Sequence, residues 1–409
     1  MNLELNSQLM QQIERCQFYN VKKNRPCNME VYKTGGQYCV FHGQQDIDWI
    51  ECPLDPSHKV KKVKMDKHLK ICNKKKLEEE LKQNPFFKEK INLEEDAQQK
   101  KMKLQTLSKE QFNELIEMIP QAFKKAIAIY QEYLGKIGEQ TENCYSYILD
   151  EIVEEAPQKI SDKEKDLQQV ELLTQIMDQY NLINKDMAYI EYGAGKGRFS
   201  HQIAEKLKEK DNSMAIHVLI EREPRKLKYD RFHRDNKYFI RCKMDIRDFN
   251  LKILEQQLKD QGYDKEIQYV GVCKHMCGGA SDLTLTSLLT QERFPVGMTI
   301  ATCCHHLCDK NTYKNLAFMN QINVPEHLIE LLFQTSSWYV SGSINQQKKV
   351  KTENEISSDQ RKTLGKMAKR IIDIGRVLYI NQITQLKVIL KKYCEQQLSP
   401  ENFIILLYK

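Results

Sequence analysis

The hydrophobic positions of the chain change their period near residue 184. In "QFNELIEMI", the apolar residues Phe112, Leu115, Ile116 and Ile119 follow the i, i+3, i+4, i+7 spacing of an amphipathic helix. Beyond residue 184, short apolar runs such as "MAYIEY" and "VGMTIATC" have the length and composition of buried strands. The pattern predicts a helical part over 111–183 and an α/β part over 184–409, which ends with strands in "LKVILKKY" and "NFIILLYK".

The first strand of the α/β part runs directly into a glycine-rich turn. Met187–Tyr192 form a mainly apolar strand, Gly193, Gly195 and Gly197 follow at alternate positions, and an amphipathic helix begins near Arg198. Glycine allows a sharp turn and a close approach of the backbone to a ligand, although G-x-G-x-G alone is a weak signal. The strand, turn and helix together predict a Rossmann-like sheet.

Three acidic residues stand where the first three strands of this sheet end. Glu191 precedes the glycine turn, Glu221 ends the second strand, and Asp245 lies just beyond the third. Glu221 is placed to bind two ribose hydroxyls, and an acid at position 191 suits a sulfonium amino acid better than a pyrophosphate. We therefore expect S-adenosylmethionine as the cofactor. The expected binding residues are Glu191, Gly193, Ala194, Gly195, Gly197, Glu221, Asp245 and Lys274.

Ionisable side chains gather where the fourth and fifth strands are predicted to end, in "CKHMCGGASDLTL" and "CCHHLCD". Ligands bind at the carboxyl ends of the strands in a doubly wound sheet, and histidines are suited to act as bases near neutral pH. Asp282 is expected either to hold a histidine or to cap the helix that begins near "SDLTL". The candidate catalytic residues are His305, His306, Lys274, His275 and Asp282.

The same two segments allow other interpretations. The candidate ligands for a zinc ion are Cys273, His275, Cys277, Cys303, Cys304, His305, His306 and Cys308. Adjacent pairs such as Cys303 and Cys304 argue against a metal, because they cannot all point at one ion from a strand end. Alternatively, most of these cysteines are small buried core residues.

Two sets of four cysteine and histidine residues precede the helical part. The stronger set has the spacing C-x5-H-x9-H-x3-C and consists of Cys52, His58, His68 and Cys72. Its last two members are four apart, so they share one side of a helix that a zinc ion would tie to the preceding turn. The other set consists of Cys16, Cys27, Cys39 and His42. Its segment has few large apolar residues, so a structural zinc would account for its folding; scattered cysteines in a poorly ordered arm are the alternative.

The net charge of +7 is concentrated in one short segment. Residues 59–76, "KVKKVKMDKHLKICNKKK", contain nine lysines and one aspartate. Lysines that neutralise phosphates release counterions, so this concentration favours a nucleic-acid-binding surface. A solvated helix face or a nuclear-import signal is the alternative.

The remaining composition predicts an intracellular protein. The thirteen cysteines occur without a secretory leader, which indicates metal ligands or reduced thiols rather than disulfides. No apolar run has membrane-spanning length, so we expect no membrane partner. The expected compartment is the nucleus, the cytoplasm or both, and no obligatory protein partner is evident.

Taken together, the motifs resemble the eukaryotic tRNA 2′-O-methyltransferases of the Trm-thirteen type. The resemblance covers nearly the whole chain and is carried by the two finger sets, "NPFF..KINL", "IEYGAGKGRFS", "MDIRD", "KHMCGGASDLTL", "IATCCHHLC", "TSSWYVSG", "KRIIDIGR" and "SPEN". Two departures are mild: Glu221 stands where Asp is expected, and Met276 stands where Leu is usual. The resemblance implies two zinc fingers that assist tRNA binding, and methylation of the ribose at acceptor-stem position four.

The motifs divide the chain into five expected parts. These are a CCCH-type zinc finger (1–45), a CHHC-type zinc finger (46–76), a charged linker (77–110), a helical part of the catalytic domain (111–183) and a Rossmann-like methyltransferase domain (184–409). Phe86 and Phe87 in the linker are expected to dock on a neighbouring domain.

The expected reaction needs a base, because a ribose hydroxyl is a poor nucleophile until its proton leaves. A positioned base contributes about 10²- to 10⁴-fold in rate. His305 or His306 is the expected base, and Lys274 would orient the hydroxyl or stabilise its developing charge. Trp338 is expected either to stack on a base or to lie in the core.

Other functions remain open at this point. The basic residues Arg361, Lys362, Lys366, Lys369, Arg370 and Arg376 are either phosphate contacts or merely exposed residues. The rival functions are methylation of another RNA or of a protein, and a non-catalytic zinc-finger adaptor that binds RNA.

Overall fold

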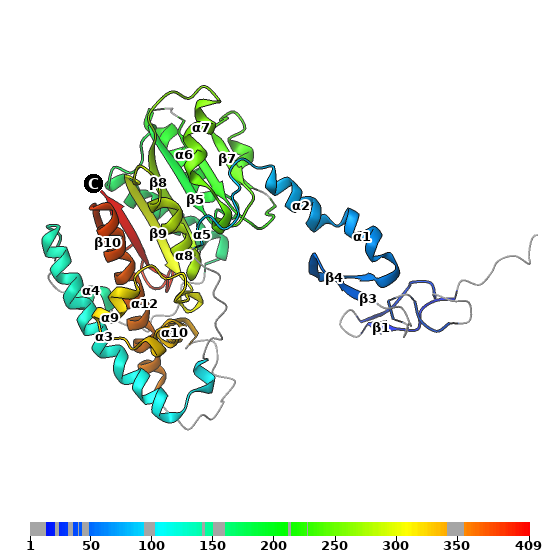
Figure 1. Cartoon of the computed structure of the whole chain (residues 1–409), viewed down its shortest axis with the longest axis horizontal. Helices are drawn as coiled ribbons and strands as arrows, with labels where there is room; N and C mark the ends of the chain where they lie inside the picture. Colours follow the sequence, from blue (N-terminus) through cyan, green and yellow to red (C-terminus); the bar gives the residue numbers. More distant parts are fainter. Residues whose placement is uncertain are drawn as a thin grey trace, which may run out of the picture. The chain divides into compact units, whose positions relative to one another are not determined.

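The structure is a computed structural model that describes residues 14–20, 24–31, 36–39, 41–42, 49–93, 103–140, 144–149, 160–211, 214–226, 228–341 and 356–409. Residues 94–102 of the expected linker, 150–159 of the expected helical part and several residues of the first expected finger lie outside this range. Contacts divide the chain into two units, residues 1–80 and 81–409 (Figure 1).

The first unit has little regular structure and very little apolar core. β1 (Tyr19–Asn20) pairs with β2 (Arg25–Pro26), and β3 (Trp49–Cys52) pairs with β4 (Asp55–Lys61), both antiparallel. η2 (Lys62–Lys64), α1 (Met65–Ile71) and α2 (Asn73–Lys82) follow. Among the described residues of this unit, the buried apolar side chains are Cys16, Cys39, Cys52, Met65 and Cys72. Since four of these are expected metal ligands, a metal ion would take the place of a hydrophobic core.

A seven-stranded sheet forms the centre of the second unit, in the order β10-β11-β9-β8-β5-β6-β7 (Figure 1). The parallel strands are β5 (Met187–Tyr192), β6 (Ile216–Ile220), β7 (Phe239–Cys242), β8 (Gln268–Cys277) and β9 (Gly297–Cys303). β10 (Lys387–Lys392) and β11 (Phe403–Tyr408) form a hairpin, and β11 joins β9 antiparallel. The predicted α/β class is confirmed. The strand order reverses at β5, where ligands bind in such sheets.

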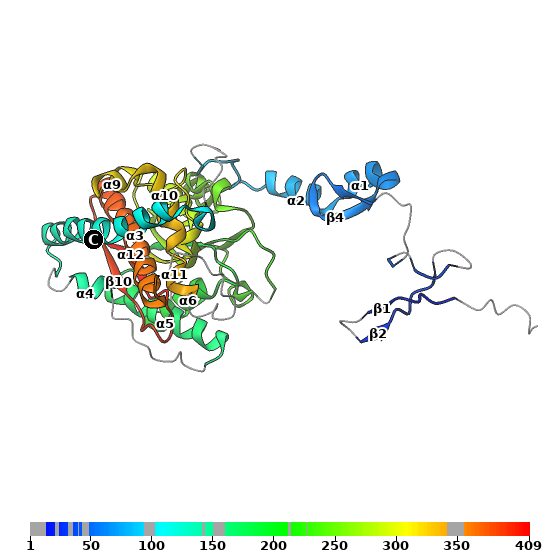
Figure 2. The same ribbon diagram turned by 90° about the horizontal axis from the view of Figure 1, so that it is seen from below.

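The two longest helices, α3 (Lys109–Lys136) and α12 (Ser358–Thr384), lie against each other (Figure 1 and Figure 2). Each begins with a capping box, formed by Ser108 with Gln111 and by Ser357 with Gln360. The hydroxyl of Tyr133 on α3 donates to the carbonyl oxygen of Val388 at 2.8 Å. This bond fixes α3 to the edge strand β10.

Shorter helices complete the second unit. They are α4 (Cys144–Leu149), α5 (Asp162–Gln179), α6 (Arg198–Asp211), α7 (Leu254–Lys259), α8 (Gly279–Leu289), α9 (Leu316–Gln321), α10 (Glu326–Thr335) and α11 (Trp338–Ser341). The 3₁₀ turns are η3 (Leu104–Thr106), η4 (Tyr229–Phe232), η5 (Ile246–Asp248), η6 (Leu251–Ile253) and η7 (His305–Leu307). None of the helices in the described ranges is both long enough and apolar enough to cross a membrane.

Part of the expected linker packs on the second unit. Phe86 is buried, and its ring stacks on that of Phe249 with 5.6 Å between the centroids. Asn92 donates from Nδ2 to the carbonyl oxygens of Ile246 and Phe249 at 2.7 and 2.8 Å. The expected docking of Phe86 is confirmed, and residues 84–92 belong to the second unit rather than to a free linker.

The burial of most basic residues of α12 agrees with neither interpretation of the sequence, phosphate contact or simple exposure. Four of the six, Lys366, Lys369, Arg370 and Arg376, are at most 2% exposed. Lys369 pairs with Glu401, and Arg370 donates from Nε to the carbonyl oxygen of Ile148 at 3.1 Å. These four side chains therefore do not contact phosphates, because they lie inside the protein.

Trp338 lies against the core of the second unit. Its ring centroid is 6.1 Å from that of Phe112, and the guanidinium of Arg361 lies 5.7 Å from its centre. These contacts favour the core interpretation over stacking on a base.

Candidate active site and metal sites

Three glycines turn the chain from β5 into α6. Gly193, Gly195 and Gly197 have φ angles of 64°, 52° and 79°, in the region that favours glycine. A Cβ atom on Gly197 would lie 2.7 Å from Cδ2 of Leu219 and 2.8 Å from Nη2 of Arg241. The turn therefore requires glycine at position 197 both for its backbone conformation and for space.

A cavity of about 170 Å³ opens beside this turn. The predicted site residues that line it are Glu191, Gly193, Ala194, Gly195, Lys274 and His275. Asp166 and Val170 of α5, and Lys196, Arg198 and Phe199 at the start of α6, complete the wall. No sequence signal pointed to the α5 residues, because only the packing of α5 beside α6 brings them to the strand tips.

Glu191 is a buried carboxyl group in the wall of this cavity. It is 3% exposed, and its Oε2 accepts a hydrogen bond from the backbone N–H of Ser200 at 3.0 Å. Burial raises the pKa of Glu191 to about 7. A cationic ligand in the cavity would restore the charged form, because a nearby opposite charge favours the carboxylate.

Glu221 and Asp245 lie at the ends of the next two strands. Oε2 of Glu221 accepts from the backbone N–H of Gly195 at 2.7 Å, so this carboxylate touches the glycine turn. Oδ1 of Asp245 accepts from the N–H of Arg247 at 3.0 Å, and its Oδ2 lies 3.4 Å from Nη1 of Arg222. The three predicted acids therefore stand along one edge of the sheet, although only Glu191 is among the described residues that line the cavity.

Lys274 is an enclosed cationic group at the cavity. Its side chain is 14% exposed; its ammonium donates to Asp166 and, at 3.3 Å, to Oε1 of Gln169. Burial lowers the pKa of Lys274 to about 8. Asp166 also accepts from Nε of Arg198 at 2.9 Å, so one carboxylate on α5 holds two cations of the site. A lysine with this pKa can exist as a neutral amine near physiological pH.

His305 does not face the cavity, contrary to the expectation that it reaches the substrate. It is 1% exposed, and its Nε2 lies 2.8 Å from Oδ1 of Asp373 on α12. The hydroxyl of Thr302 also donates to Asp373, at 3.1 Å. Burial lowers the pKa of His305, which favours a neutral ring that donates one N–H to the carboxylate. His306 is exposed on η7, and His275 is exposed beside Lys274.

Asp282 takes neither of its expected roles. It is completely buried in the first turn of α8, and its Oδ2 accepts from Nη2 of Arg376 at 2.6 Å. Gly278 rather than Asp282 is the N-cap of that helix. Nη2 of Arg376 also donates to the carbonyl oxygen of Gly278 at 3.2 Å. Asp282 therefore anchors α12 beneath the strand tips and holds no histidine.

The CHHC set converges as predicted. Nε2 of His68 lies 3.0 Å from Nε2 of His58 and 3.2 Å from Sγ of Cys52, and the sulfurs of Cys52 and Cys72 are 3.9 Å apart. Tetrahedral zinc with bonds of about 2.0 to 2.3 Å places its ligand atoms about 3.3 to 3.8 Å apart. The three distances lie within about 0.3 Å of this range, so the set fits zinc after a small adjustment. Oδ2 of Asp55 lies 3.4 Å from Nδ1 of His58, the position from which a carboxylate orients a zinc-binding histidine.

The CCCH set converges in the same way. Nδ1 of His42 lies 3.4 Å from Sγ of Cys16 and 3.3 Å from Sγ of Cys39, and the sulfurs of Cys27 and Cys39 are 3.9 Å apart. All four ligand atoms lie within 4.8 Å of one another. The ring of Phe18 stacks on His42 with 3.7 Å between the centroids, which holds the imidazole in place. This set also fits a tetrahedral zinc ion.

Six of the nine lysines of the basic segment form two groups that differ in their partners. Lys74, Lys75 and Lys76 each lie 3.9 Å from a glutamate four residues later on α2. Lys64, Lys67 and Lys70, on η2 and α1, are exposed. The second group is therefore the better candidate for phosphate contacts.

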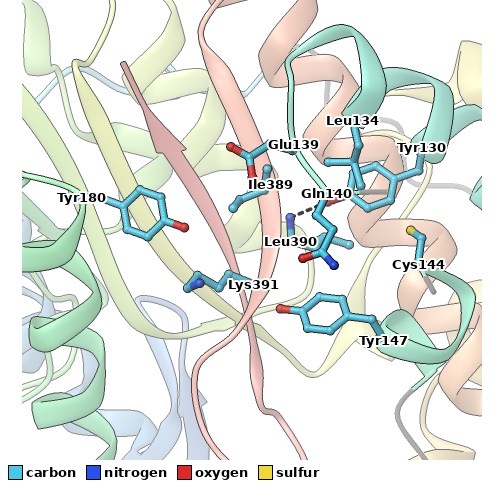
Figure 3. Close-up of a pocket in the computed structure, with 10 residues that line it drawn as sticks. All are labelled: Tyr130, Leu134, Glu139, Gln140, Cys144, Tyr147, Tyr180, Ile389, Leu390 and Lys391. Carbon is cyan, nitrogen blue, oxygen red and sulfur yellow. Dashed lines mark hydrogen bonds between the residues drawn. The ribbon is translucent and has the colours of Figure 1, made fainter. Parts of the chain in front are cut away.

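A larger cavity, of about 390 Å³, lies at the edge of the sheet, between α3, α4 and β10 (Figure 3). Tyr130, Tyr147 and Tyr180 project into it, and the backbone N–H of Leu390 donates to the hydroxyl of Tyr130 at 2.8 Å. Its described lining contains none of the predicted catalytic or cofactor-binding residues. Cavity volume alone would therefore not identify the cavity at the strand tips as the active site.

Comparison with known proteins agrees with this arrangement. Residues 167–408 match the family described as methyltransferase TRM13, residues 49–73 match a U11-48K-like CHHC zinc finger, and residues 14–43 match the CCCH zinc finger in TRM13 proteins. The fingers thus correspond to the two predicted ligand sets.

Several relatives match the chain over most of its length. The tRNA:m(4)X modification enzyme TRM13 of Vanderwaltozyma polyspora is 28% identical, over 97% of this chain and 97% of its own. The TRM13 homolog of Dictyostelium discoideum is 30% identical over 81% of this chain and 69% of its own, and that of Homo sapiens is 24% identical over 96% and 94%. Among solved structures, the plantazolicin methyltransferase BpumL in complex with SAH and a desmethylPZN analog is 11% identical, covers 72% of this chain and 99% of its own, and has a TM-score of 0.30. With the family match spanning more than half of its residues, the chain belongs to the TRM13 methyltransferase family, with a CCCH and a CHHC zinc finger before the catalytic unit.

Proposed function

We propose that this protein is an S-adenosylmethionine-dependent tRNA methyltransferase that modifies the 2′-hydroxyl of the ribose at acceptor-stem position four. The observation that carries the proposal is one cavity that brings Glu191, the glycine turn and Lys274 together at the reversal of strand order. The relatives' name, tRNA:m(4)X modification enzyme, supports tRNA as the substrate. Position four, like the ribose oxygen as acceptor, rests on the resemblance of the motifs.

The cavity residues fit this cofactor by their chemistry. The buried carboxyl of Glu191 suits an ammonium group, and Glu221 suits the two hydroxyls of a ribose. Two of the lining cations, Lys274 and Arg198, already pair with Asp166, so they do not form the open cluster of positive charge that a pyrophosphate would need. S-adenosylmethionine supplies an electrophilic methyl group when it is bound.

The protein's own residues then have three tasks. Glu191 and Glu221 bind and orient the cofactor, while Asp166 and Gln169 of α5 hold the ammonium of Lys274 at the cavity. Lys274, once neutral, would take the proton of the ribose hydroxyl, and the oxygen would accept the methyl group as the bond from that carbon to the sulfonium sulfur breaks and the sulfur leaves as a neutral thioether. His306 is the second candidate for this role, because it is exposed whereas His305 is enclosed by Asp373.

Nucleoside mass mapping tests the function. The protein is incubated with tRNA and methyl-labelled S-adenosylmethionine, and the tRNA is then digested. We expect one labelled ribose, at acceptor-stem position four. A label on a base, on another RNA or on a protein side chain would indicate the rival enzyme, and RNA binding without any transfer would indicate the adaptor. The compartment and the absence of an obligatory protein partner stay predictions.

Replacement of Glu221 by alanine should weaken binding of S-adenosylmethionine. The change removes the acceptor for the ribose hydroxyls and for the N–H of Gly195. Hydrogen bonds to a charged group contribute about 1.5 to 3 kcal/mol, so we expect affinity to fall by about 10- to 100-fold by calorimetry. Glu223→Ala, two residues away and exposed, is the matched control. Equal affinities of the two variants would contradict the assignment of Glu221.

Alanine at Lys64, Lys67 and Lys70 together should weaken tRNA binding without changing the affinity for S-adenosylmethionine. Each lysine that neutralises a phosphate contributes about 1 to the slope of log K against log salt concentration. For the triple variant, we therefore expect the magnitude of this slope to decrease by about 2 to 3. The control replaces Lys74, Lys75 and Lys76, whose partners are glutamates. The finger would not be the phosphate-binding surface if both triple variants kept the salt slope of the wild type.

A further inference from the structure

Three thiols that belong to neither zinc finger meet at the tips of β8 and β9. Cys273 of β8 pairs with Ile300 of β9, and Met276 pairs with Thr302. Between these two pairs, β8 has two residues and β9 has one, so β8 contains one extra residue. This bulge shifts the register so that Cys277 faces Cys303. The two sulfurs are 3.5 Å apart.

A third thiol joins them from the residue that follows β9. Cys304 has a φ of 46° and a ψ of 43°, the left-handed conformation that a residue with a side chain rarely adopts. The chain thus leaves the strand direction at Cys304, and the sulfurs of Cys277, Cys303 and Cys304 all lie within 4.8 Å of one another. Adjacent residues at a strand end can therefore reach one point after all, because the left-handed turn lies between them.

The distances between ligand atoms in the two zinc fingers can be compared with those among the three thiols. One sulfur pair in each finger, Cys27 with Cys39 and Cys52 with Cys72, is 3.9 Å apart, and the ligand atoms of both fingers meet the same 4.8 Å limit. Tetrahedral zinc with Zn–S bonds of about 2.3 Å requires sulfurs about 3.8 Å apart. The three thiols meet the same limit as the finger ligands, and the 3.5 Å between Cys277 and Cys303 is within about 0.3 Å of this value, so a small adjustment would suit zinc.

The loops that carry the thiols are held by protein contacts. Nη2 of Arg376 donates to the carbonyl oxygen of Gly278 and to Sγ of Cys308, at 3.2 and 3.1 Å, and the N–H of Gly278 donates to the carbonyl oxygen of Cys303 at 3.2 Å. The thiols are thus positioned before an ion arrives, which lowers the entropic cost of binding.

We infer that Cys277, Cys303 and Cys304 bind a third zinc ion, at the same edge of the sheet as the cofactor cavity. Cys303 is buried, Cys304 is half-buried and Cys277 is exposed, so an ion can enter from the solvent side. Three protein ligands leave the fourth tetrahedral position open, as in zinc sites that hold a water molecule. His305, which pairs with Asp373, and Cys308, which accepts from Arg376, are directed elsewhere.

Metal content of the full-length protein tests this inference. Protein purified without chelator should contain about three zinc ions per chain by elemental analysis and by native mass spectrometry. The variant Cys277→Ser/Cys303→Ser/Cys304→Ser should contain about two. Cys394→Ser, a buried cysteine in the segment between β10 and β11, is the matched control and should keep three. The finger variant Cys52→Ser/Cys72→Ser should lose one ion from a different site, which shows that the count distinguishes the sites.

Cobalt replacement gives a second measurement that does not depend on how well the triple variant folds. Wild-type protein loaded with Co²⁺ should show thiolate-to-metal absorption that decreases in the single variant Cys304→Ser and persists in Cys394→Ser. Two ions per wild-type chain would overturn the inference. So would a disulfide between Cys277 and Cys303, detected as an intact mass lower by two hydrogens and located by mass spectrometry of the unreduced peptides.

Discussion

Replacement of Lys274 by methionine is expected to lower the rate of methyl transfer by about 10²- to 10⁴-fold, the usual contribution of a positioned base. Methionine fills a similar volume but cannot accept a proton. Binding of S-adenosylmethionine should stay near the wild-type affinity, because Glu191, Glu221 and the glycine turn are unchanged. Single-turnover transfer to tRNA, together with calorimetry, measures the two effects separately.

The pH dependence of the wild type supplies an independent test of the same role. Burial lowers the pKa of Lys274 to about 8, so at pH 7 only about one tenth of the molecules carry the neutral amine that can act as a base. The single-turnover rate should therefore rise with pH from neutrality and level off above about pH 8. If Lys274 instead acted in its protonated form, the rate would fall as the pH rises through 8.

Two further variants separate the possible roles of this position. Lys274→Arg keeps the positive charge but provides no base, so it should be nearly as inactive as Lys274→Met. Retention of activity in Lys274→Arg would instead indicate that the charge stabilises the developing alkoxide. Lys265→Met, whose side chain is 72% exposed, is the control. Loss of activity in His306→Ala with little loss in Lys274→Met would assign the base to the histidine.

The strands and the metal ligand sets could be predicted because their signals are local. β5, β6 and β9 are buried along their whole length, so their sequences are mainly apolar, with few polar residues such as Glu191 and His217. The CHHC ligands include two residues four apart on α1 and its end, which a helix places on one side. The glycine turn follows its strand directly, and the structure has a positive φ at all three positions.

The failures concern residues whose partners lie far away along the chain. The partner of His305 is Asp373, 68 positions later, and Asp282 meets Arg376, 94 positions later. No periodicity in "IATCCHHLC" shows which of two adjacent histidines points inward, because a 3₁₀ turn of three residues has no repeating face. The burial of two basic residues of α12 also depends on distant partners: Lys369 pairs with Glu401, and Arg376 pairs with Asp282 of α8.

The bulge in β8 is a feature that the sequence did not predict. It lies at Lys274 and His275, and it both directs Lys274 toward α5 and aligns Cys277 with Cys303. A bulge depends on the pairing of two strands, so neither strand alone indicates it. The sequence could therefore not predict that Cys277 and Cys303 meet, since an unbulged strand would not bring Cys277 opposite Cys303.

Removal of the Asp373 carboxylate is expected to lower the free energy of unfolding of the catalytic unit by about 3 to 5 kcal/mol, the usual cost of breaking a buried charge network on one side. Asp373 is completely buried, and its oxygens lie 3.5 Å from Arg370 and 3.5 Å from Arg376. Asp373→Ala leaves these guanidiniums with less compensating charge, and it also deprives His305 and Thr302 of their acceptor.

The pH dependence of stability should reveal the same carboxylate. Burial alone would raise the pKa of Asp373, but the hydrogen bond from His305 and the nearby guanidiniums of Arg376 and Arg370 outweigh it and lower the pKa to about 2. A depressed pKa means that the stabilisation is present above the unfolded value of about 4 and is lost as the pH falls toward 2. The difference corresponds to about 2 kcal/mol, and Asp373→Asn should abolish this part of the acid sensitivity.

Urea unfolding of the full chain, followed by circular dichroism, measures these changes. Asp359→Ala, near the start of the same helix and 75% exposed, is the matched control and should change the stability by no more than about 0.5 kcal/mol. Asp373 holds η7, and with it Cys304, beneath the strand tips through His305. We therefore expect Asp373→Ala to weaken binding at the proposed third zinc site as well, whereas unchanged stability together with unchanged metal content would show that the network does not position these loops.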